Sequence, residues 1–494
     1  MNGLRGVRDR YSMILSRLSA FYSGRDFIAP FRFHSINYKI VLMVLFMALA
    51  AVMSSILVSG MRDLTLGIVI AAGLGIILVT FIDTNIGLIL ILLSMLLSPE
   101  IEVGATAGRS VVIRAEDLLL ILVSLTWLAK MALKKELPFL RRSPLNAPIG
   151  LYTAILFIST FKGVLTGGVM PLKGTFYVLK LLEYFILYFI VTNHITKPRE
   201  VRLFFTVLLV TALIVGLYCN ATIGHVDRIS APFEGEGEPN TLGGYLLFVM
   251  SVIGGIILYD RKKRGYLLAG LLFLIPTFIF TLSRASYLGL LPVLITFAVL
   301  SRKKSVITSV LGILLAAMLL FAFGPQKLRD RVIDAFRPER QQNFKRVGIL
   351  SLGPSPAARV ESWKNVLVKR FPGKPFLGYG VTGAGFLDSQ YFLVLVETGV
   401  IGLGIFLWLM WRVWEAGLRS FKTVDRPFYK GLTIGYLAGF VGLLVHAIGS
   451  NTFIIIRIAE PFWFFTAIIV KLPDIETGKS IMEDKVPQFS RFRY

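Results

Sequence analysis

Five arginines of this chain stand close to long apolar segments, and they are Arg114, Arg228, Arg284, Arg359 and Arg457. An arginine near hydrocarbon is costly unless it is paired or solvated in a cavity. Its guanidinium presents a planar fork of donors that suits phosphate oxygens. Several arginines converging at a membrane interface would therefore form a site for a phosphate or pyrophosphate headgroup. The alternatives for each arginine are reaching to lipid headgroups or pairing with acids. The nearby acids are Glu116, Asp117, Glu183 and Glu460.

Asp388 closes a glycine-rich run, GYGVTGAGFLDSQYF, immediately before an apolar segment. A carboxylate there could act as a general base that takes a proton from a sugar hydroxyl. Asp and Ser at such a place are also ordinary N-caps of a helix, and the two roles are compatible. No strand is expected before the run and no Gly-Lys-Ser/Thr follows it, which argues against a nucleotide site.

Three further ionisable residues, Glu397, His446 and His225, are candidate functional residues. Glu397 lies nine residues into the apolar segment after Asp388, and an ionisable residue inside a membrane span is a functional candidate. The alternative is a hydrogen bond between helices near small residues. His446 and His225 are candidates for a base or for a polar pairing group. The scattered histidines and the single cysteine, Cys219, give no metal motif and no disulfide framework.

The elements that must position these residues are membrane helices. The chain is 55% hydrophobic with a mean hydropathy of +0.72, and a soluble domain needs more surface charge than this allows. Its apolar residues fall in blocks of roughly 17–25, the length of a helical span, without the alternation of a membrane barrel. We expect an all-α polytopic protein with about 12–14 transmembrane helices. The blocks lie near 39–60, 64–82, 85–98, 116–133, 147–163, 173–194, 201–220, 241–259, 265–282, 284–300, 305–324, 389–411, 430–450 and 455–471.

Residues 264–300 form an apolar stretch that is too long for one span. At 1.5 Å per residue its helix would be roughly 55 Å long, against roughly 30 Å of hydrocarbon. We therefore expect two short spans with a turn at Ser283–Arg284.

The charge pattern predicts which side each loop faces. The net charge of +24 is explained by Lys/Arg-rich loops at alternate connections, as the positive-inside rule requires, so no nucleic acid is implied. These loops are LKKELPFLRR (133–142), TKPREVR (196–202), DRKKR (260–264), SRKK (301–304) and WRVWEAGLRSFKTVDRPFYK (411–430). The N-terminus and the C-terminus are then both cytoplasmic.

One long loop falls on the opposite, outer side. Residues 325–387 hold twelve Lys or Arg against four Asp or Glu, and the loop is longer than a tight connection needs. Val360, Trp363, Val366 and Leu367 share one helical face, so 358–371 could lie along the membrane surface. The expected organisation is a cytoplasmic segment 1–38, helices 1–11 in 39–324, the large extracytoplasmic loop 325–388, helices 12–14 in 389–471, and a cytoplasmic tail 472–494.

Four motifs on this outer side give the chain a family resemblance. They are RISAPFEGEGEPNTLGGYL (228–246), TLSRASYLGL (281–290), ARVESWKNVLVKRFPGKPFLGYGVTG (358–383) and DSQYFLVLVETGVIGLGIF (388–406). Their order and spacing resemble those of the O-antigen ligase/polymerase superfamily of bacterial envelope enzymes. The resemblance covers roughly residues 200–415.

The resemblance implies a glycosyltransferase whose donor is an oligosaccharide on an undecaprenyl pyrophosphate carrier. By this resemblance Arg228, Arg284 and Arg359 hold the pyrophosphate and stabilise charge on the leaving group. Asp388 is the expected catalytic residue. The resemblance also implies an inverting transfer that needs no metal and no nucleotide sugar. No ATP site and no cofactor are expected, because the energy already sits in the pyrophosphate bond. Supporting roles are expected for Asn240, Glu397, His446 and Arg457.

One departure from the pattern bears on the reaction. Ligases of the family typically carry His-Asn where this chain has Asp388-Ser389. An aspartate, with a reference pKa of about 3.9, is ionised at neutral pH and can accept a proton. The departure favours a polymerase of O-antigen, capsule or exopolysaccharide repeat units, with a ligase as the alternative and His446 or His225 as its base.

A transporter or flippase of lipid-linked oligosaccharide is the alternative from another class, and it would place charges near the middle of several spans. The resemblance further implies the bacterial inner membrane, membrane lipids as partners, and cooperation with flippase and chain-length regulator proteins.

Overall fold

The computed structural model describes residues 64–106, 109–133, 143–233, 238–301, 362–385 and 387–478, with a few single positions between 304 and 326. Within these residues the fold is all-α, as expected, apart from one small β-hairpin. The helices follow the apolar blocks closely. They are α3 (Leu64–Ile82), α4 (Thr84–Leu97), α5 (Ala115–Leu133), α6 (Asn146–Leu165), α7 (Pro171–His194), α8 (Pro198–Thr222), α9 (Pro239–Tyr259), α10 (Arg264–Phe280), α11 (Arg284–Ser301), α15 (Gln390–Thr423), α16 (Pro427–His446) and α17 (Ile456–Thr477).

Seven of the described helices are long and apolar enough to cross a membrane, and they are α6, α7, α8, α9, α11, α15 and α16. The chain is therefore an integral membrane protein. The predicted blocks 39–60 and 305–324 fall outside the continuous described segments, so the total of 12–14 spans remains a prediction. The sidedness of the loops and of both termini is also a prediction.

The structure confirms that the 264–300 stretch is divided in two. Helix α10 ends at Phe280 and α11 begins at Arg284. Leu282, between them, adopts a φ of 50°, a left-handed conformation that no continuous helix contains. A segment of roughly 55 Å has thus become two shorter helices joined by a tight turn.

A β-hairpin occupies the predicted outer segment before α5. Strand β1 (Glu100–Thr106) pairs antiparallel with β2 (Arg109–Arg114). The register places Glu100 opposite Arg114, and the ladder is irregular between Glu102 and Gly104. The elements expected from the sequence do not include this hairpin.

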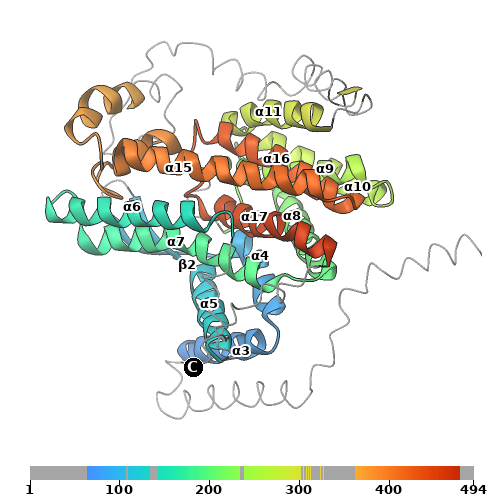
Figure 1. Cartoon of the computed structure of the whole chain (residues 1–494), viewed down its shortest axis with the longest axis horizontal. Coiled ribbons are helices and arrows are strands. Elements are labelled where there is room, and N and C mark those ends of the chain that lie inside the picture. The colour runs from blue at the N-terminus through green and yellow to red at the C-terminus, as the bar shows by residue number, and fades with distance from the viewer. Residues whose placement is uncertain are drawn as a thin grey trace, which may run out of the picture.

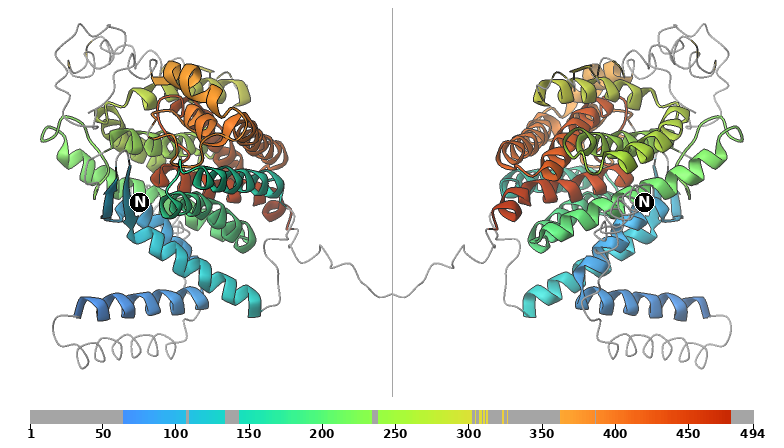
Figure 2. Two further views of the ribbon diagram at one scale, coloured as in Figure 1. Left: turned by 90° about the vertical axis from the view of Figure 1, so that its left-hand side faces the viewer. Right: turned by 90° about the vertical axis from the view of Figure 1, so that its right-hand side faces the viewer.

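Most of the helices from α6 onward lie side by side with their axes roughly parallel (Figure 1). Helix α5 runs at a steep angle to them and packs against α3. Helix α3 lies at the edge of the described helices in both turned views (Figure 2). The long helix α15 packs against α6, and α7 packs against α17. The bundle proper is therefore built from α6–α11 and α15–α17.

Helices α9 and α16 form the tightest seam of the bundle. A Cβ atom on Gly255 would lie 2.3 Å from the carbonyl oxygen of Gly431, and one on Gly435 would lie 2.6 Å from that of Ser251. No side chain fits at such distances, so small residues let the two backbones touch. This seam fixes how the first turn of α9 lies relative to the last turn of α16.

Candidate functional site

The turn between α10 and α11 brings two predicted arginines together. Arg228 donates from Nε to the carbonyl oxygen of Thr281 at 3.3 Å and from Nη2 to that of Leu282 at 3.5 Å. Its neighbour Ile229 donates its N–H to Phe280 O at 3.1 Å. Arg284 is the first residue of α11 and follows this turn directly. Arg228 is thus fixed against the turn that carries Arg284, and both side chains are partly exposed.

The first turn of α9 lies against the same place. Ser283 Oγ donates to Asn240 Oδ1 at 2.8 Å, and Ser286 Oγ donates to Ser283 Oγ at 2.8 Å. The amino-terminal ends of α9 and α11 therefore meet beside Arg228. Helix amino termini carry unpaired N–H groups and a partial positive charge, so they favour anions. Two such ends with two arginines make an arrangement suited to a phosphate or pyrophosphate.

His446 lies on the other side of the α9 head. Cβ atoms added to Gly243 and Gly244 would lie 2.3 Å from Ser286 Oγ and 3.1 Å from His446 Cε1, respectively. The imidazole is fully buried, and its Nδ1 is 2.7 Å from Thr452 Oγ1. Two adjacent glycines of α9 thus separate the serine pair of α11 from His446.

Asp388 sits in a segment anchored to the turn after His446. Asn451 Nδ2 donates to Leu387 O at 2.7 Å, and the Gln390 N–H donates to Ala447 O at 3.1 Å. These bonds fix the backbone on both sides of Asp388, whose side chain is partly exposed. Asp388 and His446 are therefore held in neighbouring segments, but only Asp388 reaches the protein surface.

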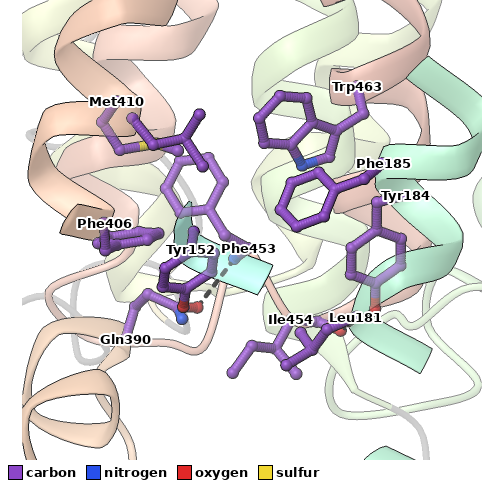
Figure 3. Close-up of a pocket in the computed structure, with 11 residues that line it drawn as sticks. Tyr152, Leu181, Tyr184, Phe185, Gln390, Phe406, Met410, Phe453, Ile454 and Trp463 are labelled. Carbon is purple, nitrogen blue, oxygen red and sulfur yellow. Dashed lines mark hydrogen bonds between the residues drawn. The ribbon is translucent and has the colours of Figure 1, made fainter. Parts of the chain in front are cut away.

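Gln390 joins this segment to a narrow aromatic cavity (Figure 3). Its Oε1 accepts the N–H of Phe453 at 3.0 Å. The cavity is about 20 Å³, close to the room needed by a single water molecule. It is lined by Tyr152, Leu181, Tyr184, Phe185, Gln390, Phe406, Leu409, Met410, Phe453, Ile454 and Trp463.

The glycine-rich loop before Asp388 docks into a break in α15. Gly399 has a φ of 71°, which opens the helix. Tyr379 N–H then donates to Val396 O at 2.9 Å, and Gly380 N–H donates to Glu397 O at 2.8 Å. Backbone groups freed inside a membrane helix must find new partners, and here the loop provides them.

Glu397 holds that loop from inside the bundle. Its Oε1 accepts the N–H of Thr382 at 2.8 Å, and its side chain is buried. Ser159 of α6 donates to Glu397 O at 2.6 Å. The Glu397 side chain therefore bonds the glycine-rich loop, and the bond between helices α6 and α15 uses the Glu397 backbone carbonyl. Glu397 thus positions the loop that leads to Asp388.

Arg457 is fully buried and serves as a clamp. Its Nη1 donates to Pro232 O and its Nη2 to Ser98 O, both at 3.2 Å. It thereby connects the loop after Arg228 to Ser98, which lies two residues before strand β1. Arg114 shows the other alternative, because it forms an ion pair with buried Glu116 at 3.5 Å.

Arg359 lies outside the part of the chain that the structure describes, and so does most of the predicted loop 325–388. Of the predicted apolar face, Trp363 stacks on Phe392 with ring centroids 5.2 Å apart. Val366 is buried, whereas Leu367 is 46% exposed. The described part of this face therefore covers the start of α15 in part and faces outward in part.

Sequence reasoning missed three polar residues that organise the site. Ser283 connects α11 to Asn240, Gln390 connects α15 to Phe453, and Ser159 connects α6 to Glu397. Each is a polar residue at the end of a span or within it, which is a signal that the sequence carries. Among the described residues no group of three or more His, Cys, Asp and Glu could hold a metal ion.

Residues 269–407 match a protein-family model described as O-antigen ligase. The matched stretch runs from within α10 to the first half of α15 and includes Arg284, the glycine-rich loop and Asp388. It does not include Arg228 or His446. A search of curated proteins finds no match to the chain.

Proposed function

We propose that this chain is a member of the O-antigen ligase/polymerase superfamily and that it polymerises oligosaccharide repeat units carried on a polyprenyl pyrophosphate. The match of residues 269–407 to the O-antigen ligase family model supports the first part of this proposal. The reaction takes place at the outer face of the bacterial inner membrane. The superfamily match supports a glycan-transferring membrane enzyme, and the residues around the two helix heads support the donor and the reaction.

One observation carries the proposal: Arg228 is hydrogen-bonded to the turn that begins α11 with Arg284. Two guanidinium groups and two helix amino termini there present donors and positive charge to one small region. A leaving pyrophosphate develops negative charge on its oxygens as the glycosidic bond breaks. Preorganised donors lower the barrier because they stabilise that charge more in the transition state than in the ground state.

The bond changes are those of a single displacement. An acceptor hydroxyl oxygen attacks the anomeric carbon of the donor sugar while the bond from that carbon to the pyrophosphate oxygen breaks. Asp388 takes the hydroxyl proton, and the polyprenyl pyrophosphate leaves with the bonding electron pair. The anomeric configuration inverts, and the carboxylate becomes a carboxylic acid that later loses its proton to water.

Asp388 supports polymerisation in particular. It stands at the place where ligases of this superfamily typically carry histidine, and its side chain is partly exposed. A ligase is the second candidate function, because His446 lies beyond the turn that holds Leu387 and Gln390. His446 is fully buried, so an acceptor hydroxyl reaches it less easily than it reaches Asp388.

Reconstitution of the full chain in proteoliposomes with a pyrophosphate-linked repeat unit tests the proposal. A ladder of products is expected from a polymerase, a single transferred product on an added acceptor from a ligase, and lipid movement without a new glycosidic bond from a flippase. Asp388→Asn should lower the rate by about 10²–10⁴-fold with unchanged protein yield and folding. Full activity of this variant would contradict the assignment of the base.

A further inference from the structure

A second candidate site lies on the segment that precedes the glycine-rich loop. This segment contains a π-helical turn, Val366–Arg370, and a 3-10 turn, Phe371–Gly373. Beside it is a cavity of about 250 Å³. The cavity is lined by Arg370, Tyr379, Gly383, Ala384 and Gly385.

One basic residue, Arg370, lines this cavity, and the segment around it is basic. Between residues 362 and 385 the chain has four basic residues, Lys364, Lys369, Arg370 and Lys374, and no acid. The cavity wall also contains two glycines, whose backbone a ligand can approach closely. A guanidinium and accessible backbone suit a phosphate group.

The cavity is held in shape by its own contacts. Arg370 Nη1 donates to Ala384 O across it, and Tyr379 Oη donates to Arg370 O at 2.9 Å. Lys374 Nζ donates to Thr166 Oγ1 of the turn after α6 at 3.1 Å. The segment is therefore fastened both to the glycine-rich loop and to the bundle, so a ligand would meet a preformed wall.

The same segment carries exposed apolar side chains next to its charges. Leu367 is 46% exposed, Val368 63% and Phe376 66%. It lies at the end of the bundle where α15 begins (Figure 1). Apolar side chains interleaved with Lys and Arg at the end of a membrane bundle are typical of a segment at the water–lipid boundary, where phosphate groups of lipids are concentrated.

We propose that this cavity binds the phosphate ester of a lipid, separately from Arg228 and Arg284. The carrier of that phosphate is either a glycerophospholipid headgroup or the pyrophosphate of a lipid-linked glycan. Drug-sized ligands fill pockets of about 300–1,000 Å³, so a cavity of about 250 Å³ takes a phosphate group with its first substituents and leaves the rest of the lipid outside.

Native mass spectrometry of the full chain in detergent micelles distinguishes the two sources. Phosphatidylglycerol is the probe for the headgroup and farnesyl pyrophosphate is the probe for the donor. Arg370→Gln removes the guanidinium and should weaken binding of the true ligand by about tenfold or more. Arg419→Gln is the matched control, because Arg419 is exposed on the distal part of α15 and pairs with Glu415 at 3.2 Å.

Weaker phosphatidylglycerol binding with unchanged farnesyl pyrophosphate binding identifies the headgroup, and the opposite result identifies the donor. Should Arg370→Gln reduce the yield of folded protein, Arg370→Lys keeps the positive charge but loses the planar fork of donors, and it should still weaken binding severalfold. Equal binding by wild type, Arg370→Gln and Arg370→Lys would overturn the proposal. Since binding is measured without turnover, loss of activity in Asp388→Asn has no bearing on this result.

Discussion

Two breaks in helical structure among the described residues, at the α10–α11 turn and at Gly399, have their freed carbonyl groups hydrogen-bonded in different ways. At the α10–α11 turn, the side chain of Arg228 donates to two freed carbonyl oxygens, those of Thr281 and Leu282. At Gly399 in α15, backbone N–H groups of the glycine-rich loop donate to the freed carbonyl oxygens. The bonds from Arg228 place a positively charged side chain beside the α10–α11 turn. The bonds at Gly399 bury neutral backbone groups.

This difference predicts which region affects the reaction and which region affects stability. The side chains of Arg228 and Arg284 beside the turn are partly exposed, so these two arginines should affect the reaction more than the stability. The break at Gly399 is buried and closely packed, so its residues should affect stability first and activity only through the loop that leads to Asp388.

The largest effect is expected from Gly399→Ala. A Cβ atom there would lie 2.1 Å from Phe376 O, and the φ of 71° disfavours any side chain. Strain and overpacking together should cost about 4 kcal/mol of unfolding free energy, measured as loss of folded protein on heating in detergent. Gly404→Ala, on the same helix with nothing within 4 Å, is the control and should be neutral. Equal stability of the two variants would remove the distinction between the breaks.

Arg228→Ala should act in the opposite way. Loss of one preorganised donor to a developing charge costs about 10²–10³ in rate, so chain growth in proteoliposomes should fall by about 100-fold. Thermal stability should change little, because the bonds that Arg228 makes are long and partly exposed. A variant that is unstable but fully active per folded molecule would reverse the comparison.

Glu397 gives the smallest and sharpest test. Glu397→Ala leaves the Thr382 N–H without its acceptor at 2.8 Å, which should cost about 1–3 kcal/mol of stability. Glu397→Gln retains a carbonyl oxygen and should recover most of the loss, both in thermal stability and in chain growth. If Gln fails as badly as Ala in activity while it restores stability, the charge itself takes part in the reaction and Glu397 is more than a positioning residue.

The helices were largely predictable, because lipid forces long apolar blocks and the block lengths fix the turns. The division at Ser283–Arg284 followed from length alone. The apolar block predicted near 389–411 falls on a longer helix, because α15 continues to Thr423. Ion pairs of Glu415 with Arg412 and Arg419 stabilise that continuation at (i, i+3) and (i, i+4) spacing.

The candidate site was predictable in its residue types but not in its connections. The sequence predicts that Arg228 and Arg284 bind phosphate, yet the bonds of Arg228 to Thr281 and Leu282 depend on how the chain returns in space. The burial of Arg457 against Pro232 O and Ser98 O is of the same kind. The β-hairpin was missed because its short segment was interpreted only as a connection.

The contact of glycine backbones between α9 and α16 has a mechanical consequence. Because no side chain separates Gly255 from Gly431, the two helices are in direct backbone contact and cannot readily slide along each other. Helices α9 and α16 should therefore move as one rigid unit. Any displacement of His446 at the end of α16 would also displace Asn240 at the start of α9. The spacing across the head of α9 would then stay constant during the proposed transfer reaction.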